Sequence, residues 1–305
     1  MGPVKKDILG LKEMPEAEIG EILETAKSMK KLLSSGMKRT PHLQGKTIVC
    51  IFYEDSTRTR LSFELASKYM SANQANITSG GSSVSKGETL IDTARTIDVM
   101  AADVIVIRHP MSGAPHLLAK HVKASVINAG DGMHEHPTQG LLDMYTILEK
   151  KGRIEGLRVA IIGDVLHSRV ARSNIWGLQK MGASVCVAGP YTLMPRDINK
   201  MGATFFDTVH EAVTGADVVM GLRLQLERQK QGLLPNIREY SRFFGVDQTK
   251  LRLVKPDVLV MHPGPVNRGV ELSSDVIDAD FSAIDEQVTN GVAVRMSLLY
   301  HITKR

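Results

Sequence analysis

The feature that most constrains this chain is an alternation of short, β-branched apolar runs with longer segments of helical periodicity. Strands separated by ten or more residues of helical pattern form βαβ units, which place those strands parallel in one sheet. The strand-like runs lie at 46–53, 104–107, 125–128, 158–164, 184–189, 203–207, 217–221 and 257–265. Helical patterns cover 15–35, 57–70, 137–150, 168–181 and 284–303. The predicted fold class is α/β, with two domains that each hold a parallel sheet flanked by helices.

The chain divides into two sets of strands near residues 150–156, where the sequence KKGRIEG supplies charge and glycine. Its length of 305 residues agrees with this division, because domains average about 150 residues. The two cysteines, Cys50 and Cys186, both lie inside apolar runs, so we expect them to be buried and reduced, as in a cytoplasmic protein.

The charge balance indicates an anionic partner. There are 38 Lys and Arg residues against 33 Asp and Glu, a formal net charge of +5. Nucleic acid, a membrane surface and small acidic substrates would all fit this excess. A nucleic-acid binder needs a basic stripe with interleaved aromatics, but aromatics are 5% here and the basic runs are dipeptides. No uncharged apolar run reaches the roughly 18 residues of a membrane helix, and the first ten residues do not resemble a secretory signal. We therefore expect neither a nucleic acid nor a membrane as partner.

Polar and cationic groups follow the predicted strands, where ligands bind in parallel sheets. The first group is Ser56-Thr57-Arg58-Thr59-Arg60, just before a predicted helix. A helix N-terminus presents free N–H groups and binds anions, although two solvated arginines beside an ordinary cap would also explain this segment. The phosphate loop G-x-x-x-x-G-K-[ST] is absent, so phosphate binding here does not imply ATP.

Similar groups follow the next two strands. Arg108 directly follows the run at 104–107, while His136 and Gln139 flank Pro137 at the start of a predicted helix. These donors suit an anion or a carbonyl oxygen, and helix capping is the simpler alternative. The spacing His134-x-His136 also fits a metal site, but no cysteine or carboxylate cluster at ligand spacing supports that interpretation.

Further polar groups occur in one loop and in the second set of strands. Ser82 and Lys86 lie in a small polar loop, where a solvated lysine is the ordinary interpretation. Gly163-Asp164 with Arg169, Arg223 with Gln225, and His262-Pro263-Gly264-Pro265 each follow a predicted strand. Surface charge or turn chemistry would explain any one of them alone. The fingerprint G-x-G-x-x-G is absent, which argues against NAD.

Taken together, these motifs resemble the transcarbamoylase family along essentially the whole chain. The resemblance rests on Ser56-Thr57-Arg58-Thr59-Arg60 with Ser62-Phe63-Glu64, Arg108-His109-Pro110, His136-Pro137-Thr138-Gln139 and His262-Pro263-Gly264-Pro265, in the family's order. Lys86-Gly87-Glu88-Thr89, Gly163-Asp164 with Arg169, and Arg223-x-Gln225-x-Glu227-Arg228 resemble the branch that uses aspartate. The sequence departs from the best-known pattern at Leu226, where a lysine is usual, and at Gly264, where a leucine is usual.

The resemblance implies transfer of the carbamoyl group from carbamoyl phosphate to L-aspartate, the committed step of pyrimidine synthesis, without a metal or other cofactor. It implies a carbamoyl-phosphate domain of residues 1–150 plus the C-terminal helix 284–305, and an aspartate domain of residues 151–283. It also implies a homotrimer with shared sites, in which Ser82 and Lys86 reach the neighbouring chain. A regulatory chain and a dihydroorotase are the further partners that the resemblance leaves open.

Residue roles follow by matching position. Carbamoyl phosphate would contact Ser56, Thr57, Arg58, Thr59, Arg108, His136, Gln139, Gly264 and Pro265, the last two across a peptide that is often cis. Aspartate would contact Lys86, Arg169, Arg223 and Gln225. The catalytic set would be Arg58, Thr59, Arg108, His136 and Lys86. Glu54, Arg169 and Arg228 would link the two domains on closure.

Two alternative enzymes remain open. A transcarbamoylase for ornithine needs a carboxylate for the ornithine side chain, whereas Arg223 and Gln225 occupy the corresponding stretch here. A zinc amidohydrolase, indicated by His134-x-His136, would contain bound metal and lose activity to a chelator.

Overall fold

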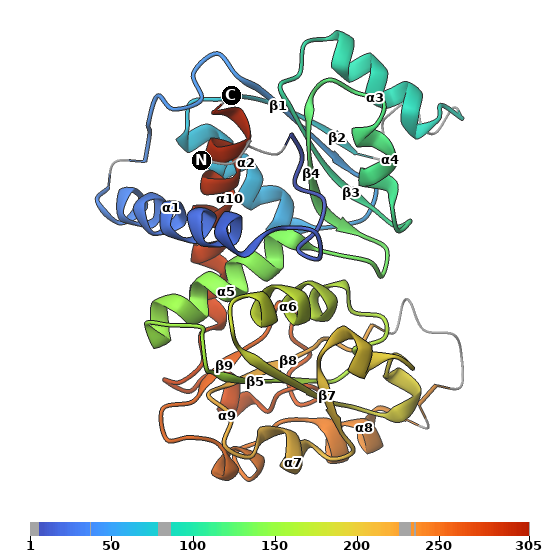
Figure 1. Cartoon of the computed structure of the whole chain (residues 1–305), viewed down its shortest axis with the longest axis vertical. Helices are drawn as coiled ribbons and strands as arrows, with labels where there is room; N and C mark the ends of the chain where they lie inside the picture. The colour runs from blue at the N-terminus through green and yellow to red at the C-terminus, as the bar shows by residue number, and fades with distance from the viewer. Residues whose placement is uncertain (1–5, 37, 79–86, 226–232, 235, 305) are drawn as a thin grey trace. The chain divides into compact units, whose positions relative to one another are not determined.

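The computed structural model describes residues 6–36, 38–78, 87–225, 233–234 and 236–304. Ser82, Lys86, Leu226 and Arg228, all named above, lie outside these residues. The contacts of the chain divide it into two units (Figure 1), which we describe separately. Unit 1 comprises Met1–Leu142 and Val288–Arg305, and unit 2 comprises Asp143–Gln287. The domain boundaries expected from the resemblance stay a prediction.

Unit 1 contains a sheet of four parallel strands in the order β2-β1-β3-β4. The strands are β1 (Thr47–Phe52), β2 (Asn73–Thr78), β3 (Val104–His109) and β4 (Ser125–Asp131). All seven residues of β4 are buried, and so are five of the six in β1. The continuous apolar runs at these positions are typical of strands that are covered on both faces.

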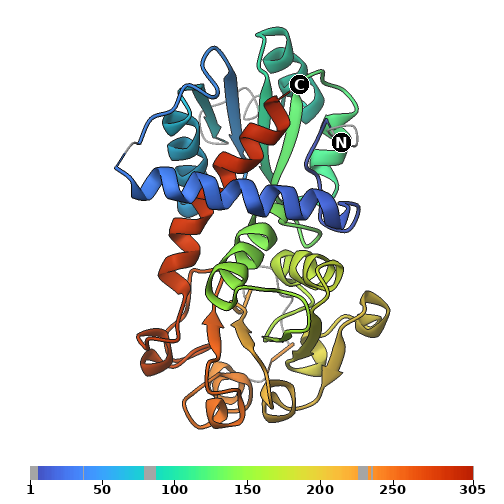
Figure 2. The ribbon, with the colours of Figure 1, turned by 60° about the vertical axis from the view of Figure 1, so that its left-hand side comes forward.

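Helices cover both faces of this sheet: α1 (Glu16–Ser34), α2 (Thr57–Tyr69), α3 (Leu90–Val99), α4 (Ala114–Ala119) and the C-terminal part of α10 (Ile284–Thr303). Buried residues of α3 and α4 pack on alternate residues of the strands, such as Val49 and Ile51 of β1. The helix α1 buries an i, i+3, i+4 stripe that runs from Ile19 to Met29. It crosses α10 (Figure 2), and Ser297 of α10 donates to the carbonyl of Ile22 at 2.8 Å.

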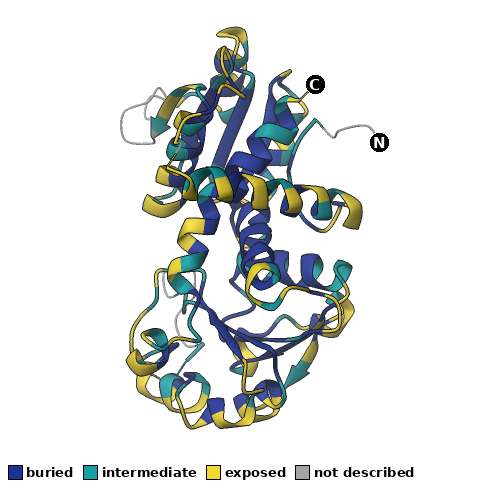
Figure 3. Cartoon of the chain, turned by 90° about the vertical axis from the view of Figure 1, so that its left-hand side faces the viewer, coloured by how far each residue is buried: buried dark blue, intermediate teal, exposed yellow. Residues whose placement is uncertain are grey.

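Unit 2 contains five parallel strands in the order β7-β6-β5-β8-β9. The strands are β5 (Arg158–Ile162), β6 (Ser184–Ala188), β7 (Thr204–Phe206), β8 (Val218–Gly221) and β9 (Leu259–Met261). The main helices are α5 (Pro137–Lys151), which begins in unit 1, α6 (Arg169–Lys180), α7 (Val209–Val213), α8 (Ile237–Phe244) and α9 (Ser274–Ile277). Short 3-10 helices lie at Tyr191–Leu193, Ile198–Met201 and Lys250–Leu253. The central strands are buried (Figure 3), and one face of the sheet packs against α7 and α9.

Each sheet has one point where the strand order reverses direction. In unit 1 it lies between β1 and β3, and in unit 2 between β5 and β8. At such a switch point the connections leave in opposite directions, so the carboxyl ends of the two strands border a crevice where ligands bind. Several of the polar groups predicted from the sequence follow these four strands, and others follow β4 and β9.

The predicted fold class is confirmed, but several elements differ from the prediction, including the unpredicted helices α7, α8 and α9. The strand β2 was not predicted, because Asn73, Gln74 and Asn76 give it no apolar run and it pairs with a neighbour on one side only. The strand β9 covers three residues instead of the nine at 257–265. Cys50 and Cys186 are buried and free, as predicted. Among the described residues, no helix is both long and apolar enough to span a membrane.

Candidate active site

The N-terminus of α2 brings polar groups to the switch point of unit 1. Ser56 is the N-cap residue in an extended conformation, but its side chain makes no capping hydrogen bond. The first turn of a helix also has N–H groups without intrahelical partners. Thr57 and Arg58 are exposed here, while Thr59 is buried. The local structure therefore matches an anion site, with backbone N–H groups, hydroxyls and one guanidinium.

Arg108 lies across the switch point from these residues. It is the register partner of Phe52 in β1, and its Nε lies 3.2 Å from Oε2 of Glu54. The neighbouring His109 accepts a hydrogen bond from the backbone N–H of Met111 at 3.0 Å. Burial lowers the pKa of His109, so its ring is neutral at pH 7. Arg108, at the end of β3, therefore lies beside the residues that follow β1.

His136 is held at the start of α5. Its ring is 4% exposed, and Oγ1 of Thr138 lies 3.4 Å from its Nδ1. The backbone N–H of Gln139 donates to the carbonyl of His136 at 3.0 Å. The helix start therefore holds His136 as a buried residue beside the Thr138 hydroxyl.

The two histidines of the His134-x-His136 motif have different partners. Nδ1 of His134 lies 3.0 Å from Oδ2 of Asp131, whereas His136 faces Thr138. Among the described residues, the candidate metal group that includes His134 does not include His136. The geometry thus separates the pair on which the amidohydrolase alternative depended.

In unit 2, Asp164 and Arg169 follow β5 and are both buried. Oδ1 of Asp164 lies 2.8 Å from Nδ1 of His167 and accepts from the His167 N–H at 3.2 Å. Ser168 caps α6 by accepting from the N–H of Ala171, and Arg169 is the first helical residue, with 3% of its surface exposed. Gly163 has a φ of +128°, and an added Cβ would lie 2.7 Å from the Tyr240 hydroxyl, so this turn requires glycine.

The segment after β8 carries Arg223 and Gln225 and is tied to Asp164. The N–H of Gln225 donates to Oδ2 of Asp164 at 3.4 Å, and its side-chain amide donates to the Arg223 carbonyl at 3.4 Å. Glu271 holds the same segment from the other side, because Leu224 N–H donates to its Oε1 at 2.9 Å. The structure therefore places Arg223 and Gln225 beside the loop that leads to Arg169.

The loop after β9 contains a cis peptide between Gly264 and Pro265, as the resemblance implies. Nδ1 of His262 accepts from the Gly264 N–H at 2.9 Å. Oε2 of Glu271 accepts from the N–H of Asn267 at 2.7 Å, and Oε1 accepts from the Asn267 amide at 2.7 Å. Glu271 is 2% exposed, so one buried carboxylate joins the loops after β8 and β9.

Sequence reasoning missed the positioning roles of Glu271 and Asp131. Glu271 lies 47 residues from Leu224, so its partners could not be inferred from local spacing. Asp131 ends β4 directly, and a carboxylate at a strand end was the available signal. Both side chains hold backbone in place and were not among the candidate ligands.

The comparison with protein families is decisive at this point. The model of the carbamoyl-phosphate-binding domain of aspartate/ornithine carbamoyltransferases matches residues 6–149, and the model of the Asp/Orn-binding domain matches residues 155–302. The chain belongs to the aspartate/ornithine carbamoyltransferase family. The resemblance in the motifs is thereby confirmed.

Individual relatives indicate which members of this family the chain is similar to. The aspartate carbamoyltransferase catalytic subunit of Ruminiclostridium cellulolyticum is 70% identical over 98% of this chain and 96% of its own length. That of Heliobacterium modesticaldum is 64% identical over 97% and 95%. A crystal structure of Trypanosoma cruzi aspartate transcarbamoylase with N-(phosphonacetyl)-L-aspartic acid has a TM-score of 0.89 at 32% identity, covering 99% of this chain and 97% of that one. Ornithine carbamoyltransferase from Pyrococcus furiosus has a TM-score of 0.85, also at 32% identity, with coverages of 96% and 95%. The fold therefore identifies the family without choosing between the two amine substrates.

Proposed function

We propose that this chain is an aspartate carbamoyltransferase that makes N-carbamoyl-L-aspartate and phosphate for pyrimidine synthesis in the cytoplasm. The relatives at 64% and 70% identity carry this name. The observation that carries the choice of aspartate is the cationic end of β8. Arg223 and Gln225 lie there, and the nearby carboxylates of Asp164 and Glu271 already accept hydrogen bonds from the protein. Ornithine would need a carboxylate for its side-chain ammonium, whereas aspartate needs cations.

The proposed chemistry needs positioning and charge stabilisation. Ser56, Thr57 and Arg58 hold the phosphate group at the α2 N-terminus, together with the backbone contacts of Gly264 and Pro265. Thr59, Arg108, His136 and Gln139 stabilise the carbonyl oxygen as negative charge develops on it. The amino group of aspartate, held by Lys86, Arg169, Arg223 and Gln225, forms the new C–N bond. The C–O bond to phosphate then breaks, and the released phosphate accepts the amine's proton.

Product assays with each amine test the choice of substrate. With carbamoyl phosphate present, we expect aspartate to be carbamoylated and ornithine to be left unchanged. In the variant Arg223→Ala the KM for aspartate should rise strongly, while the exposed Arg252→Ala serves as a matched control. Turnover of ornithine, or an Arg223→Ala variant with unaltered aspartate kinetics, would contradict the assignment.

We also propose the homotrimer with shared sites, with domains divided as residues 1–150 plus 284–305 and 151–283. Mixing two inactive chains, Arg58→Ala and Lys86→Ala, tests the sharing. Random mixing in equal amounts should restore about one quarter of the sites, because each mixed trimer contains one site that lacks neither residue. Native mass measurement checks the trimer, and mixed trimers without activity would contradict the role of Lys86 in a neighbouring site.

A further inference from the structure

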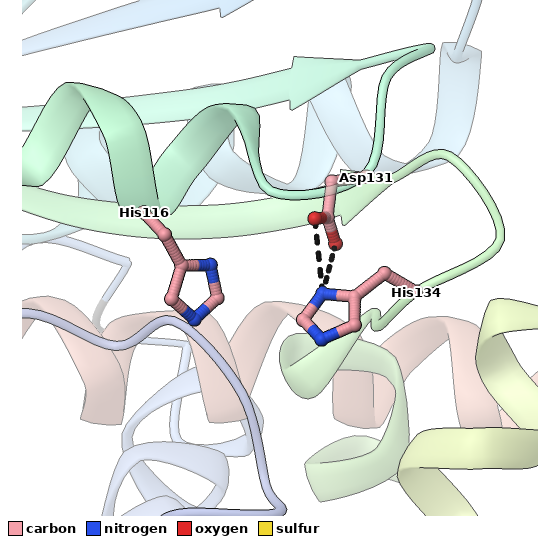
Figure 4. A group of neighbouring side chains, drawn as sticks. All are labelled: His116, Asp131 and His134. Carbon is pink, nitrogen blue, oxygen red and sulfur yellow. Dashed lines mark hydrogen bonds and ion pairs between the residues drawn. The ribbon is translucent and has the colours of Figure 1, made fainter.

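A cluster of two histidines and one aspartate lies in unit 1, apart from the groups assigned to the substrates. It consists of His116 on α4, Asp131 at the end of β4 and His134 in the following loop (Figure 4). One ligand atom from each residue lies within 4.8 Å of the others. The three side chains face a common space, and the two imidazole centroids are 5.4 Å apart.

The distances between these ligand atoms are close to the distances expected between the ligand atoms of a bound metal ion. Two ligand atoms on a tetrahedral zinc ion with bonds of about 2.0–2.1 Å lie about 3.3 Å apart. Nδ1 of His134 and Oδ2 of Asp131 are already 3.0 Å apart. The side chain of His134 is 34% exposed, which leaves its ring accessible to an ion from solvent.

The carboxylate of Asp131 is fixed by donors other than the histidines. Oδ2 accepts from the N–H of Gly113 at 2.6 Å, and Oδ1 accepts from the Asn128 amide at 2.8 Å and from the Glu135 N–H at 3.1 Å. Burial alone would raise the pKa of Asp131, but these bonds and that of His134 outweigh it and lower the pKa. Such outer hydrogen bonds orient the ligands in metal sites.

His116 supplies an independent observation. Its Nδ1 is buried and has no hydrogen-bond partner among the described residues. A buried polar atom without a partner costs free energy, and an ion at this position would satisfy it. The nitrogen points toward the side on which Asp131 and His134 lie (Figure 4).

A cavity of about 420 Å³ adjoins the cluster and leaves room for water ligands. Both histidines line it, together with the carboxylates of Asp7, Glu13 and Glu135. Lys6 and Lys12 also line it, but the ammonium of Lys6 is directed to the carbonyls of Val122 at 2.6 Å and Ala119 at 3.1 Å. The acidic groups therefore balance the two lysines.

We propose that His116, Asp131 and His134 bind a divalent transition-metal ion that fastens α4 to the loop before α5. Two imidazoles and one carboxylate favour Zn²⁺ or Co²⁺ over Mg²⁺, which prefers oxygen ligands. The ion has a structural role, because the carbamoyl transfer proposed above uses other residues. The proposal does not depend on which amine the enzyme carbamoylates.

Titration of the chelator-treated full chain with Co²⁺ tests the site. We expect one equivalent per chain, visible d–d absorption of a tetrahedral ion, displacement by Zn²⁺ and a raised melting temperature. His116→Asn and His134→Asn should each weaken binding more than about tenfold, whereas His210→Asn, which replaces an exposed histidine of α7, should bind as the parent does.

Circular dichroism verifies that the variants fold; both replaced side chains are partly exposed, so folding should survive. Absence of stoichiometric binding by the parent protein would overturn the proposal on its own, whatever the variants do. Undiminished binding in both variants would overturn it as well.

Discussion

The two switch points share a topology, yet the helices that follow them begin differently. Ser56 at the start of α2 makes no side-chain cap, and Thr57 and Arg58 are exposed. Ser168 at the start of α6 caps its own helix, and Arg169 beside it is buried. A helix start without a side-chain cap can accept an anion, whereas a capped start uses its own side chain in that place. The strand order thus predicts where a ligand site lies in each sheet. Whether the following helix start is capped by a side chain then affects whether that helix start can bind an anion.

The loops at the two points are also held differently. In unit 1 the ion pair between Glu54 and Arg108 joins neighbouring strand ends. In unit 2 two buried carboxylates, Asp164 and Glu271, accept backbone N–H groups from the segment after β8. We infer that the first site gains its shape from the sheet, and the second from buried carboxylates. The following variants test this contrast.

The largest effect is expected for Arg58→Ala. Loss of one donor that stabilises charge in the transition state costs about 2.7–4 kcal/mol, or roughly 10²–10³ in kcat. Steady-state kinetics should show this loss, together with a raised KM for carbamoyl phosphate. Arg60→Ala, two residues later in the same helix, is the control and should retain activity. Equal behaviour of the two variants would mean that the α2 N-terminus is not the phosphate site.

His136→Ala separates hydrogen-bond donation from base catalysis. We expect kcat to fall about a hundredfold while the pH–rate profile keeps its shape, because a donor does not change protonation during the reaction. His121→Ala is a control on another histidine of unit 1. Loss of one limb of the profile in His136→Ala would identify the residue as a general base instead.

Glu271→Gln tests whether a buried carboxylate shapes the second site. Gln keeps the size of the side chain but cannot accept all three hydrogen bonds, so the segment after β8 should loosen. We expect the KM for aspartate to rise about tenfold, equivalent to about 1.4 kcal/mol, with little change in the KM for carbamoyl phosphate. Asp275→Asn replaces an exposed carboxylate of α9 and should leave both unchanged. An equal rise in both KM values would show a general loss of structure.

The smallest expected effect is on the stability of the fold, and it concerns His301, which lies away from both switch points. Burial lowers the pKa of His301, which hydrogen-bonds Oγ1 of Thr25 through Nε2 at 2.8 Å. Below the unfolded pKa of about 6.5 the unfolded chain binds a proton that the folded chain does not, so stability falls as the pH falls. The urea concentration at the midpoint of unfolding should fall less between pH 7.5 and pH 5.5 in His301→Gln than in the parent protein. A variant that loses as much as the parent would assign the acid sensitivity to other groups.

The sequence predicted the parts of the fold that rest on local pattern. Apolar runs located β1, β3 and β4, and Pro137 marked the first residue of α5. It did not reveal β2, which has no apolar run and pairs with β1 at the edge of the sheet. The site motifs could be recognised in the sequence because their cationic residues come directly after predicted strands. Glu271 did not, because its role arises from backbone groups far away in the sequence.

The path of the chain has a consequence for synthesis. Unit 2 is continuous from Asp143 to Gln287, but unit 1 includes Val288–Arg305. Domains generally fold in order as they leave the ribosome. The helix α10 is translated last, and its Ser297 and His301 form hydrogen bonds with residues of α1. The first part of the chain to be translated therefore cannot complete its hydrogen bonds to α10 until the last residues have been made.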